Sequence, residues 1–378
     1  MELYEVENDA EKALRDKADR AYTPFGGCIE LLPVCNMDCK MCYVRMSREE
    51  MDRAGRMLSC DEWLTITRQA ADMGVMNLLL TGGEPLLYPE FKRLYRGLQQ
   101  MGIILSVNTN GTLIDEEWAD FFAESYCRRI SISLYGKDDA TYGELCRNPR
   151  GFSQVMRAAE LLKARGVPFR FTCSVTEDNA ADLPELFAIA KRVGVPLQPA
   201  TYMFPALRRG ISAQQQVRLG PERAAQLMFE SYRHQMNEEE MKQSVARTLT
   251  RLLTPPRMPG VNGKGFTCHT GRSGFWLTWK GEMIPCGMLD EPRFSLLEHG
   301  FADCWKQLVE ATGHVVYPRE CLRCPLQNIC HVCPAALVAE TGSTDIVPQY
   351  VCRYTKELVR QMQTYLLPEL KQNEPRER

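Results

Sequence analysis

The chain has 378 residues, a length that suggests two or three domains, and its composition (44% hydrophobic, 25% charged) suits a protein that buries a core. A net charge of −2 excludes the strong basic field of a protein that binds nucleic acid or an anionic membrane. No apolar run reaches the roughly 18 residues that span a bilayer. The N-terminus is acidic and polar, unlike a signal peptide, so we expect a cytoplasmic protein.

The 16 cysteines are many for a reducing compartment, where disulfides are rare. Ligation of metals or iron–sulfur clusters explains this excess better than a disulfide framework does. Ten cysteines fall into two spaced groups, described below. The remaining six are interpreted as small buried hydrophobic residues: Cys28, Cys60, Cys127, Cys146, Cys173 and Cys304.

Residues 7–20 carry the capping residues and the weak apolar stripe of a helix. Apolar segments of strand length follow at 28–33, 76–81, 103–108, 130–134, 169–175 and 195–199. Amphipathic segments of helical period lie between them, at 60–73, 90–101, 115–124, 151–165 and 182–192. This alternation predicts an α/β fold with a parallel sheet, in which the six strands form a partial (β/α)6 barrel similar to a TIM barrel. Such barrels carry their chemistry at the C-terminal ends of the strands.

The pattern breaks after residue 200, where loop-like and helical segments lead into a Pro- and Gly-rich linker and then a cysteine-rich region. We therefore expect five regions: an N-terminal helix (1–27), the barrel (28–200), a helical connector (201–265), a cysteine-rich domain (266–356) and a C-terminal helix and tail (357–378).

Three cysteines, Cys35, Cys39 and Cys42, follow the first predicted strand at CxxxCxxC spacing. Three thiolates leave one iron of a four-iron cluster without a protein ligand. A zinc site fits less well, because zinc ligands usually come as CxxC pairs. The spacing resembles that of the radical S-adenosylmethionine (SAM) enzymes. The resemblance implies that SAM binds the open iron and is cleaved reductively to a 5′-deoxyadenosyl radical, which abstracts a substrate hydrogen. The family usually has an aromatic residue before the third cysteine, where this chain has Met41.

Gly82-Gly83-Glu84 ends the second predicted strand. Alone it is an ordinary glycine turn, but after the cysteine motif it resembles the family motif that holds the SAM amino group. The same resemblance places Asn110 near SAM, Ser133 at its ribose and Arg147 at its carboxylate. We therefore predict a SAM site at the strand ends.

Seven further cysteines lie near the C-terminus: Cys268, Cys286, Cys321, Cys324, Cys330, Cys333 and Cys352. Two CxxC pairs among them are compatible with a zinc ribbon, although the other three would then have no role. The array resembles the SPASM domain of peptide-modifying radical SAM enzymes, except that only two residues separate Cys330 from Cys333.

The SPASM resemblance implies two auxiliary iron–sulfur clusters. The first would be held by Cys268, Cys286 and Cys333, and the second by Cys321, Cys324, Cys330 and Cys352. No cysteine lies between Cys268 and Cys286. Either His269 or a distant residue completes the first cluster, or its iron is open to a substrate thiolate.

These resemblances imply a radical SAM oxidoreductase that needs anaerobic conditions, three [4Fe–4S] clusters, SAM and a ferredoxin or flavodoxin as reductant. Our prediction is a maturase that installs a thioether or carbon–carbon cross-link in a ribosomally made peptide. Its leader would dock on residues 200–265 or through a separate leader-binding protein.

The first alternative is an anaerobic sulfatase maturase, which makes formylglycine. In those enzymes an Asp follows the second SPASM cysteine as the proposed base, whereas this chain has Gly287 there and Asp290 three residues on. Asp290, Tyr202 and Glu282 all stay open as the base. An alternative from another class is a non-catalytic iron–sulfur electron carrier or zinc-binding module.

Overall fold

The computed structural model describes residues 9–212, 214–255, 265–330 and 332–372. Seven parallel strands form its centre: β1 (Gly26–Glu30), β2 (Asn77–Thr81), β3 (Ile104–Thr109), β4 (Arg129–Ser133), β5 (Phe169–Ser174), β6 (Leu197–Ala200) and β7 (Gly274–Leu277). Two antiparallel strands, β8 (Glu282–Ile284) and β9 (Phe294–Ser295), complete one nine-stranded sheet in the order β6-β5-β4-β3-β2-β1-β7-β8-β9.

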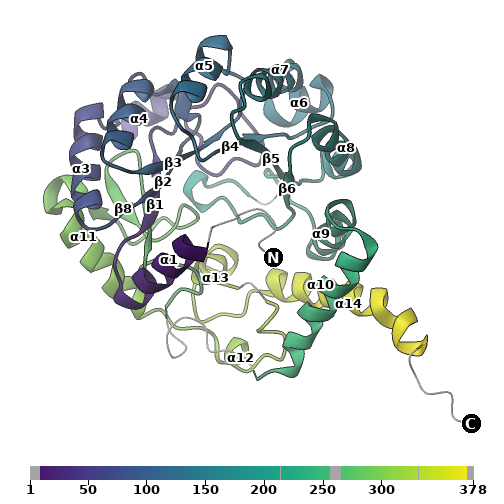
Figure 1. Cartoon of the computed structure of the whole chain (residues 1–378). Coiled ribbons are helices and arrows are strands. Elements are labelled where there is room, and N and C mark those ends of the chain that lie inside the picture. The colour runs from purple at the N-terminus through teal and green to yellow at the C-terminus, as the bar shows by residue number, and fades with distance from the viewer. Residues whose placement is uncertain (1–8, 213, 256–264, 331, 373–378) are drawn as a thin grey trace, which may run out of the picture.

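The helices on the outer side of the barrel strands are α3 (Cys60–Asp72), α4 (Phe91–Gln100), α5 (Glu116–Glu124), α6 (Asp139–Cys146), α7 (Gly151–Ala164) and α8 (Leu183–Val193), as Figure 1 shows. The predicted strands and helices of the barrel are confirmed to within two residues at most ends. Sequence analysis missed α6 and the short α2 (Arg48–Ala54). Gly102, Gly166 and Gly194 follow α4, α7 and α8 in left-handed geometry, with φ of +80°, +66° and +84°.

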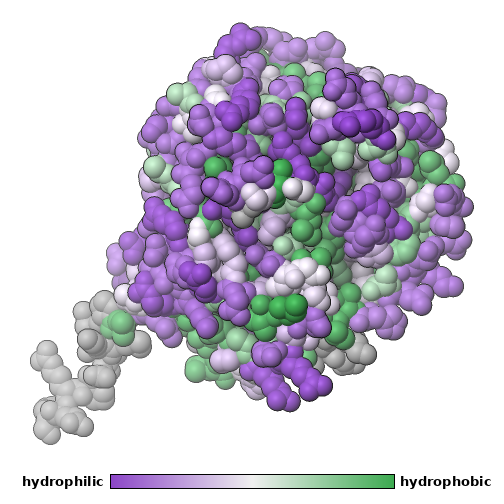
Figure 2. Space-filling view, turned by 180° about the vertical axis from the view of Figure 1, so that it is seen from behind, coloured by the Kyte–Doolittle hydropathy of each residue, from purple (hydrophilic) through white to green (hydrophobic). Residues whose placement is uncertain are grey.

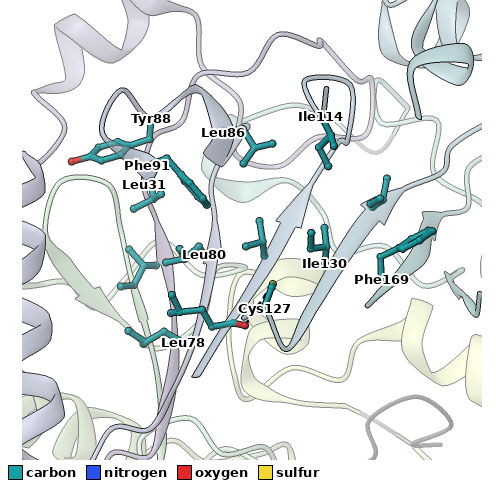
Figure 3. Packing of buried hydrophobic residues seen from close by; sticks show 14 of the residues in the cluster. Leu31, Leu78, Leu80, Leu86, Tyr88, Phe91, Ile114, Cys127, Ile130 and Phe169 are labelled. Carbon is teal, nitrogen blue, oxygen red and sulfur yellow. Dashed lines mark hydrogen bonds between the residues drawn. The ribbon is translucent and has the colours of Figure 1, made fainter. Parts of the chain in front are cut away.

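The hydrophobic core lies between the outer face of the sheet and these helices (Figure 3). Because side chains alternate along a strand, paired residues of neighbouring strands share a face. On the outer face Ile29, Leu80, Val107 and Ile130 form one row and are all fully buried. The residues one position earlier in these strands form a row on the inner face: Cys28, Leu79, Ser106 and Arg129. Each of these is partly accessible. The inner face of the barrel is thus more polar and open to solvent.

The remaining helices belong to the two ends of the chain and to the connector. They are α1 (Asp9–Ala21), α9 (Pro221–Gln235), α10 (Glu238–Thr250), α11 (Leu296–Gly313, interrupted at Gly300), α12 (Arg319–Leu322), α13 (Pro334–Thr341) and α14 (Gln349–Gln372). Helices α9, α10 and α14 pack around a second small core. The cysteine-rich region joins the barrel through β7, which pairs with β1, so the sheet crosses the predicted boundary at residue 265.

Figure 2 shows a largely hydrophilic surface on which hydrophobic residues gather toward the lower centre of the face in view. None of the described helices is long and apolar enough to cross a membrane.

Candidate active site

The three cysteines after β1 lie in one loop and remain free thiols. Two of their sulfurs accept backbone hydrogen bonds, Cys35 Sγ from the amide of Met37 (3.4 Å) and Cys42 Sγ from the amide of Arg45 (3.3 Å). Burial raises the pKa of Cys35 to about 12, with smaller contributions from Glu84, Cys39 and Cys42. The three thiols are therefore neighbours, and ligation to iron would replace protons that they otherwise hold tightly.

The loop is held from two sides. The amides of Asp38 and Lys40 donate to the carbonyls of Cys146 and Leu145 at the end of α6 (3.1 and 3.0 Å). Arg209, in the 3-10 turn Leu207–Arg209, donates to the carbonyls of Cys39 (3.2 Å) and Cys42 (3.4 Å) and to Asp38 Oδ1 (2.9 Å). No sequence motif pointed to Arg209, because it acts from a connector far along the chain.

The Gly82-Gly83-Glu84 segment packs against the backbone that leads into the cysteine loop. The amide of Gly83 donates to Leu32 O (2.7 Å) and that of Glu84 donates to Val34 O (3.0 Å). A Cβ atom at Gly83 would lie 2.4 Å from Val34 O, and one at Gly82, which has a φ of +150°, would lie 2.4 Å from Leu32 O. The glycines are thus needed for a close approach within the chain itself.

Glu84 is fully buried and accepts hydrogen bonds from Thr109 Oγ1 (2.7 Å) and from the amides of Asn110 (2.8 Å) and Leu86 (3.1 Å). Burial raises the pKa of Glu84 to about 7, although these hydrogen bonds oppose the shift. Its carboxylate ties the end of β2 to the end of β3, which fixes the wall of the predicted SAM site.

The other predicted SAM residues lie at the same end of the barrel. Asn110 Nδ2 donates to Asn36 Oδ1 (2.8 Å) and lies 3.5 Å from Cys35 Sγ. Ser133 Oγ donates to the Tyr135 hydroxyl (3.2 Å). Arg147 is exposed, and its backbone adopts the left-handed conformation (φ +57°) where α6 ends beside the cysteine loop. Their contacts with SAM stay predictions.

A buried ion pair stands on the inner face where β1 ends. Glu30 is 0% exposed, and its carboxylate accepts from Arg208 Nη2 (2.8 Å) and from Trp276 Nε1 on β7 (2.7 Å). Arg208 Nη1 also reaches the carbonyl of Gly287, next to Cys286 (3.3 Å). This network joins the barrel, the connector and the cysteine-rich region, and sequence analysis did not find it.

The C-terminal cysteines have other thiols as neighbours, and burial raises the pKa of Cys333 with added effects of both Cys268 and Cys330. Burial raises the pKa of Cys286 to about 12, with added effects of the Cys333 and Cys268 thiols. Burial likewise raises the pKa of Cys321 to about 12, and the thiols of Cys352, Cys330 and Cys324 add to the shift.

Across the described residues, no three His, Cys, Asp or Glu side chains converge on a single metal ion. Cluster ligands stand farther apart than the ligands of one ion, since each binds a different iron. The ligand roles of the cysteines stay predictions.

Each candidate for the base has a partner. Asp290 contacts Arg293, which also binds Glu282 (2.9 Å). The Tyr202 hydroxyl donates to Glu340 Oε1 (3.0 Å). His269, the candidate fourth ligand, places Nδ1 2.8 Å from Asp19 Oδ2 of α1.

Residues 29–190 match the family model described as the Radical SAM superfamily. These residues form a radical SAM domain. Enzymes of this superfamily bind SAM and a [4Fe–4S] cluster, and the cysteine loop of the radical SAM domain offers three neighbouring thiols, two of which accept a backbone hydrogen bond. A non-catalytic carrier or zinc-binding module is therefore not supported.

Two curated proteins are similar to this chain over most of its length. The AdoMet-dependent heme synthase of Methanosarcina barkeri is 25% identical over 327 residues, which are 83% of this chain and 92% of that protein. The PqqA peptide cyclase of Xanthomonas euvesicatoria is 25% identical over 344 residues, 86% of this chain and 87% of that protein.

Two solved structures share the fold. Streptococcus suis SuiB bound to S-adenosylmethionine superposes with a TM-score of 0.66 at 18% identity, covering 93% of this chain and 84% of SuiB. Native anSMEcpe with bound AdoMet and Kp18Cys peptide gives a TM-score of 0.65 at 22% identity, covering 92% of this chain and 98% of anSMEcpe.

Proposed function

We propose that the chain is a radical SAM/SPASM maturase that installs a thioether or carbon–carbon cross-link in a ribosomally made peptide. One observation carries the proposal. Strands β7 and β8 extend the sheet from β1, so the loop with Cys286 and Gly287 returns to the inner face of the barrel and contacts Trp276 and Arg208. A substrate on that face would lie between the cysteine loop and a second set of thiols.

Several features support a peptide as the substrate. PqqA peptide cyclase is a relative over 86% of this chain, and the solved structures of similar fold include SuiB bound to precursor peptide SuiA and anSMEcpe with Kp18Cys peptide. The inner face of the barrel offers hydroxyl and amide groups, among them Ser106, Ser131, Thr172 and Gln198. Such groups suit a polar backbone better than a hydrocarbon.

The proposal assigns three [4Fe–4S] clusters. Cys35, Cys39 and Cys42 would hold the radical cluster, and the two C-terminal groups would hold the auxiliary clusters. Bound there, these groups would supply reductive cleavage of SAM and a path for the electron that the oxidised substrate radical releases. A ferredoxin or flavodoxin would be the reductant, and a leader would dock on residues 200–265 or on a separate protein.

This chain's own residues would position SAM and the substrate. Gly82, Gly83 and Glu84 would shape the amino-acid end of the SAM site, with Asn110, Ser133 and Arg147 around it. Asp290 would be a candidate base, and its carboxylate contacts Arg293.

A second candidate follows from the heme synthases, which match 83% to 86% of this chain in three organisms. The substrate would then be a heme precursor.

The test is made under anaerobic conditions with reconstituted protein. Wild type should hold about twelve irons and the Cys35→Ala/Cys39→Ala/Cys42→Ala variant about eight, at four per cluster. Wild type with strong reductant should release 5′-deoxyadenosine from SAM, and the triple variant should release none. About four irons with stoichiometric zinc would refute the auxiliary clusters.

Candidate substrates are then compared by mass spectrometry. A cross-linked peptide loses two hydrogen atoms, which is the expected outcome for a small Cys-bearing peptide encoded beside this gene. Loss of sulfur from a Cys-containing sulfatase peptide would identify a sulfatase maturase, and formation of heme from a heme precursor would support the second candidate. Either result would refute the cross-linking proposal.

A further inference from the structure

Cys28 differs from the other cysteines outside the two motifs. Cys60, Cys127, Cys146, Cys173 and Cys304 are buried, as expected of small hydrophobic residues, but Cys28 is partly accessible. It lies on the inner face of β1, two residues before Glu30 and on the same side of the strand. The interpretation of Cys28 as an ordinary core residue is therefore wrong.

The sheet brings Cys28 next to the cysteine-rich region. Cys28 pairs with Trp276 of β7, and Trp276 pairs in turn with Ile284 of β8, two residues before Cys286. The chain then folds over the indole, because a Cβ at Gly287 would lie 2.6 Å from the Trp276 ring. Burial raises the pKa of the Cys28 thiol, and the Cys286 thiol is the largest electrostatic contributor. Cys28 and Cys286 are therefore neighbours on the inner face.

Cys286 is also the neighbour of Cys333 and Cys268, so Cys286 has three other thiols near it. The other candidate for a fourth ligand is His269, whose Nδ1 contacts Asp19 and whose side chain is 45% exposed. A four-iron cluster needs one terminal ligand for each iron, and thiolates are its usual ligands.

We propose that Cys28 is the fourth ligand of the first auxiliary cluster, together with Cys268, Cys286 and Cys333. The thiol would lose its proton to solvent as it binds iron. This inference rests on the auxiliary clusters of the proposed function. It implies that no iron of this cluster is open to a substrate thiolate. The cluster would then exchange electrons with the substrate radical without binding the substrate. One strand and the loop after it would carry ligands to two clusters, Cys28 to the auxiliary cluster and Cys35, Cys39 and Cys42 to the radical cluster.

The test uses the Cys35→Ala/Cys39→Ala/Cys42→Ala protein as background, so that all the iron measured is auxiliary. Cys28→Ala in this background should lower the iron content from about eight to about seven, with one iron lost from one cluster. After mild oxidation it should show the electron paramagnetic resonance signal of a three-iron cluster. Added small thiol should restore the fourth iron and remove this signal.

Cys60→Ala is the matched control, since Cys60 is a buried cysteine in α3, outside both motifs. It should keep about eight irons and the spectrum of the background. Cys28→Ser keeps the size of the side chain and covers the case in which Cys28→Ala fails to fold. It should retain the cluster with an altered spectrum, because oxygen replaces sulfur on one iron.

Two results would overturn the proposal. If the Cys28 variants keep the iron content and the spectrum of the background, Cys28 is not a ligand, and the auxiliary clusters of the proposed function still stand. If the background itself holds zinc or no iron, the auxiliary clusters and the role of Cys28 are refuted together.

Discussion

At the scale of single residues, buried charges and close backbone contacts explain the site better than motif membership does. Glu30 belongs to no motif, yet its carboxylate is fully buried and accepts hydrogen bonds from Arg208 and Trp276. Removing one partner of a buried ion pair leaves the other charge uncompensated, which typically costs about 3–5 kcal/mol. Exposed pairs contribute far less, because water and salt screen them.

We therefore predict that Arg208→Met lowers the free energy of unfolding by about 3–5 kcal/mol. The matched control is Arg353→Met, because Arg353 pairs with Glu222 at side-chain exposures of 60% and 43%; its cost should stay below about 1 kcal/mol. Urea midpoints of the two anaerobically purified variants measure the difference. Adding Glu30→Gln to Arg208→Met should recover part of the loss, and equal costs for the two single variants would contradict the prediction.

At the scale of elements, the Gly82-Gly83-Glu84 segment after β2 supports the cysteine loop, in addition to the contact with SAM that its motif implies. Gly82 and Gly83 let the end of β2 pack directly on the backbone of residues 32–34, which leads into the cysteine loop. Helix α6 and Arg209 hold the same loop from the other side. The geometry of the radical cluster thus depends on three separate elements.

Gly83→Ala should displace the cysteine loop, because the new methyl group would stand 2.4 Å from Val34 O and 2.5 Å from Pro33 O. We expect iron to fall from about twelve toward about eight, and 5′-deoxyadenosine formation to be lost. Gly220→Ala is the control, since a Cβ there meets no atom within 4 Å. Iron analysis after reconstitution makes the comparison, and full iron content in Gly83→Ala would show that the loop tolerates the shift.

At the scale of the whole molecule, one sheet joins the barrel to the cysteine-rich region. Strand β7 covers the edge of β1, and Phe275, Leu277, Phe301 and Trp305 belong to the same hydrophobic core as the barrel. Trp305 Nε1 also donates to the carbonyl of Tyr22, just after α1 (2.9 Å). The barrel therefore depends on residues that lie far beyond it in the sequence.

A chain truncated after Pro255 should not remain a folded monomer. It would expose the edge of β1 and the apolar surface beneath β7 and α11, and such edges and patches promote aggregation. Size-exclusion chromatography with light scattering, beside the full-length protein, tests this expectation. A truncated monomer that still binds about four irons would show that the barrel folds independently.

The sequence by itself determined the order and type of the barrel elements and the place of the cysteine loop after β1. These features depend on local hydrophobic periodicity and on short cysteine spacings, which can be recognised in the sequence. Only the tertiary structure decided that Cys28 lies beside Cys286 and that β7 pairs with β1. It also decided that Arg208 binds Glu30 and that Arg209 binds the cysteine loop. Those contacts follow from strand register and from packing between distant segments, and neither leaves a periodic or spaced signal in the sequence.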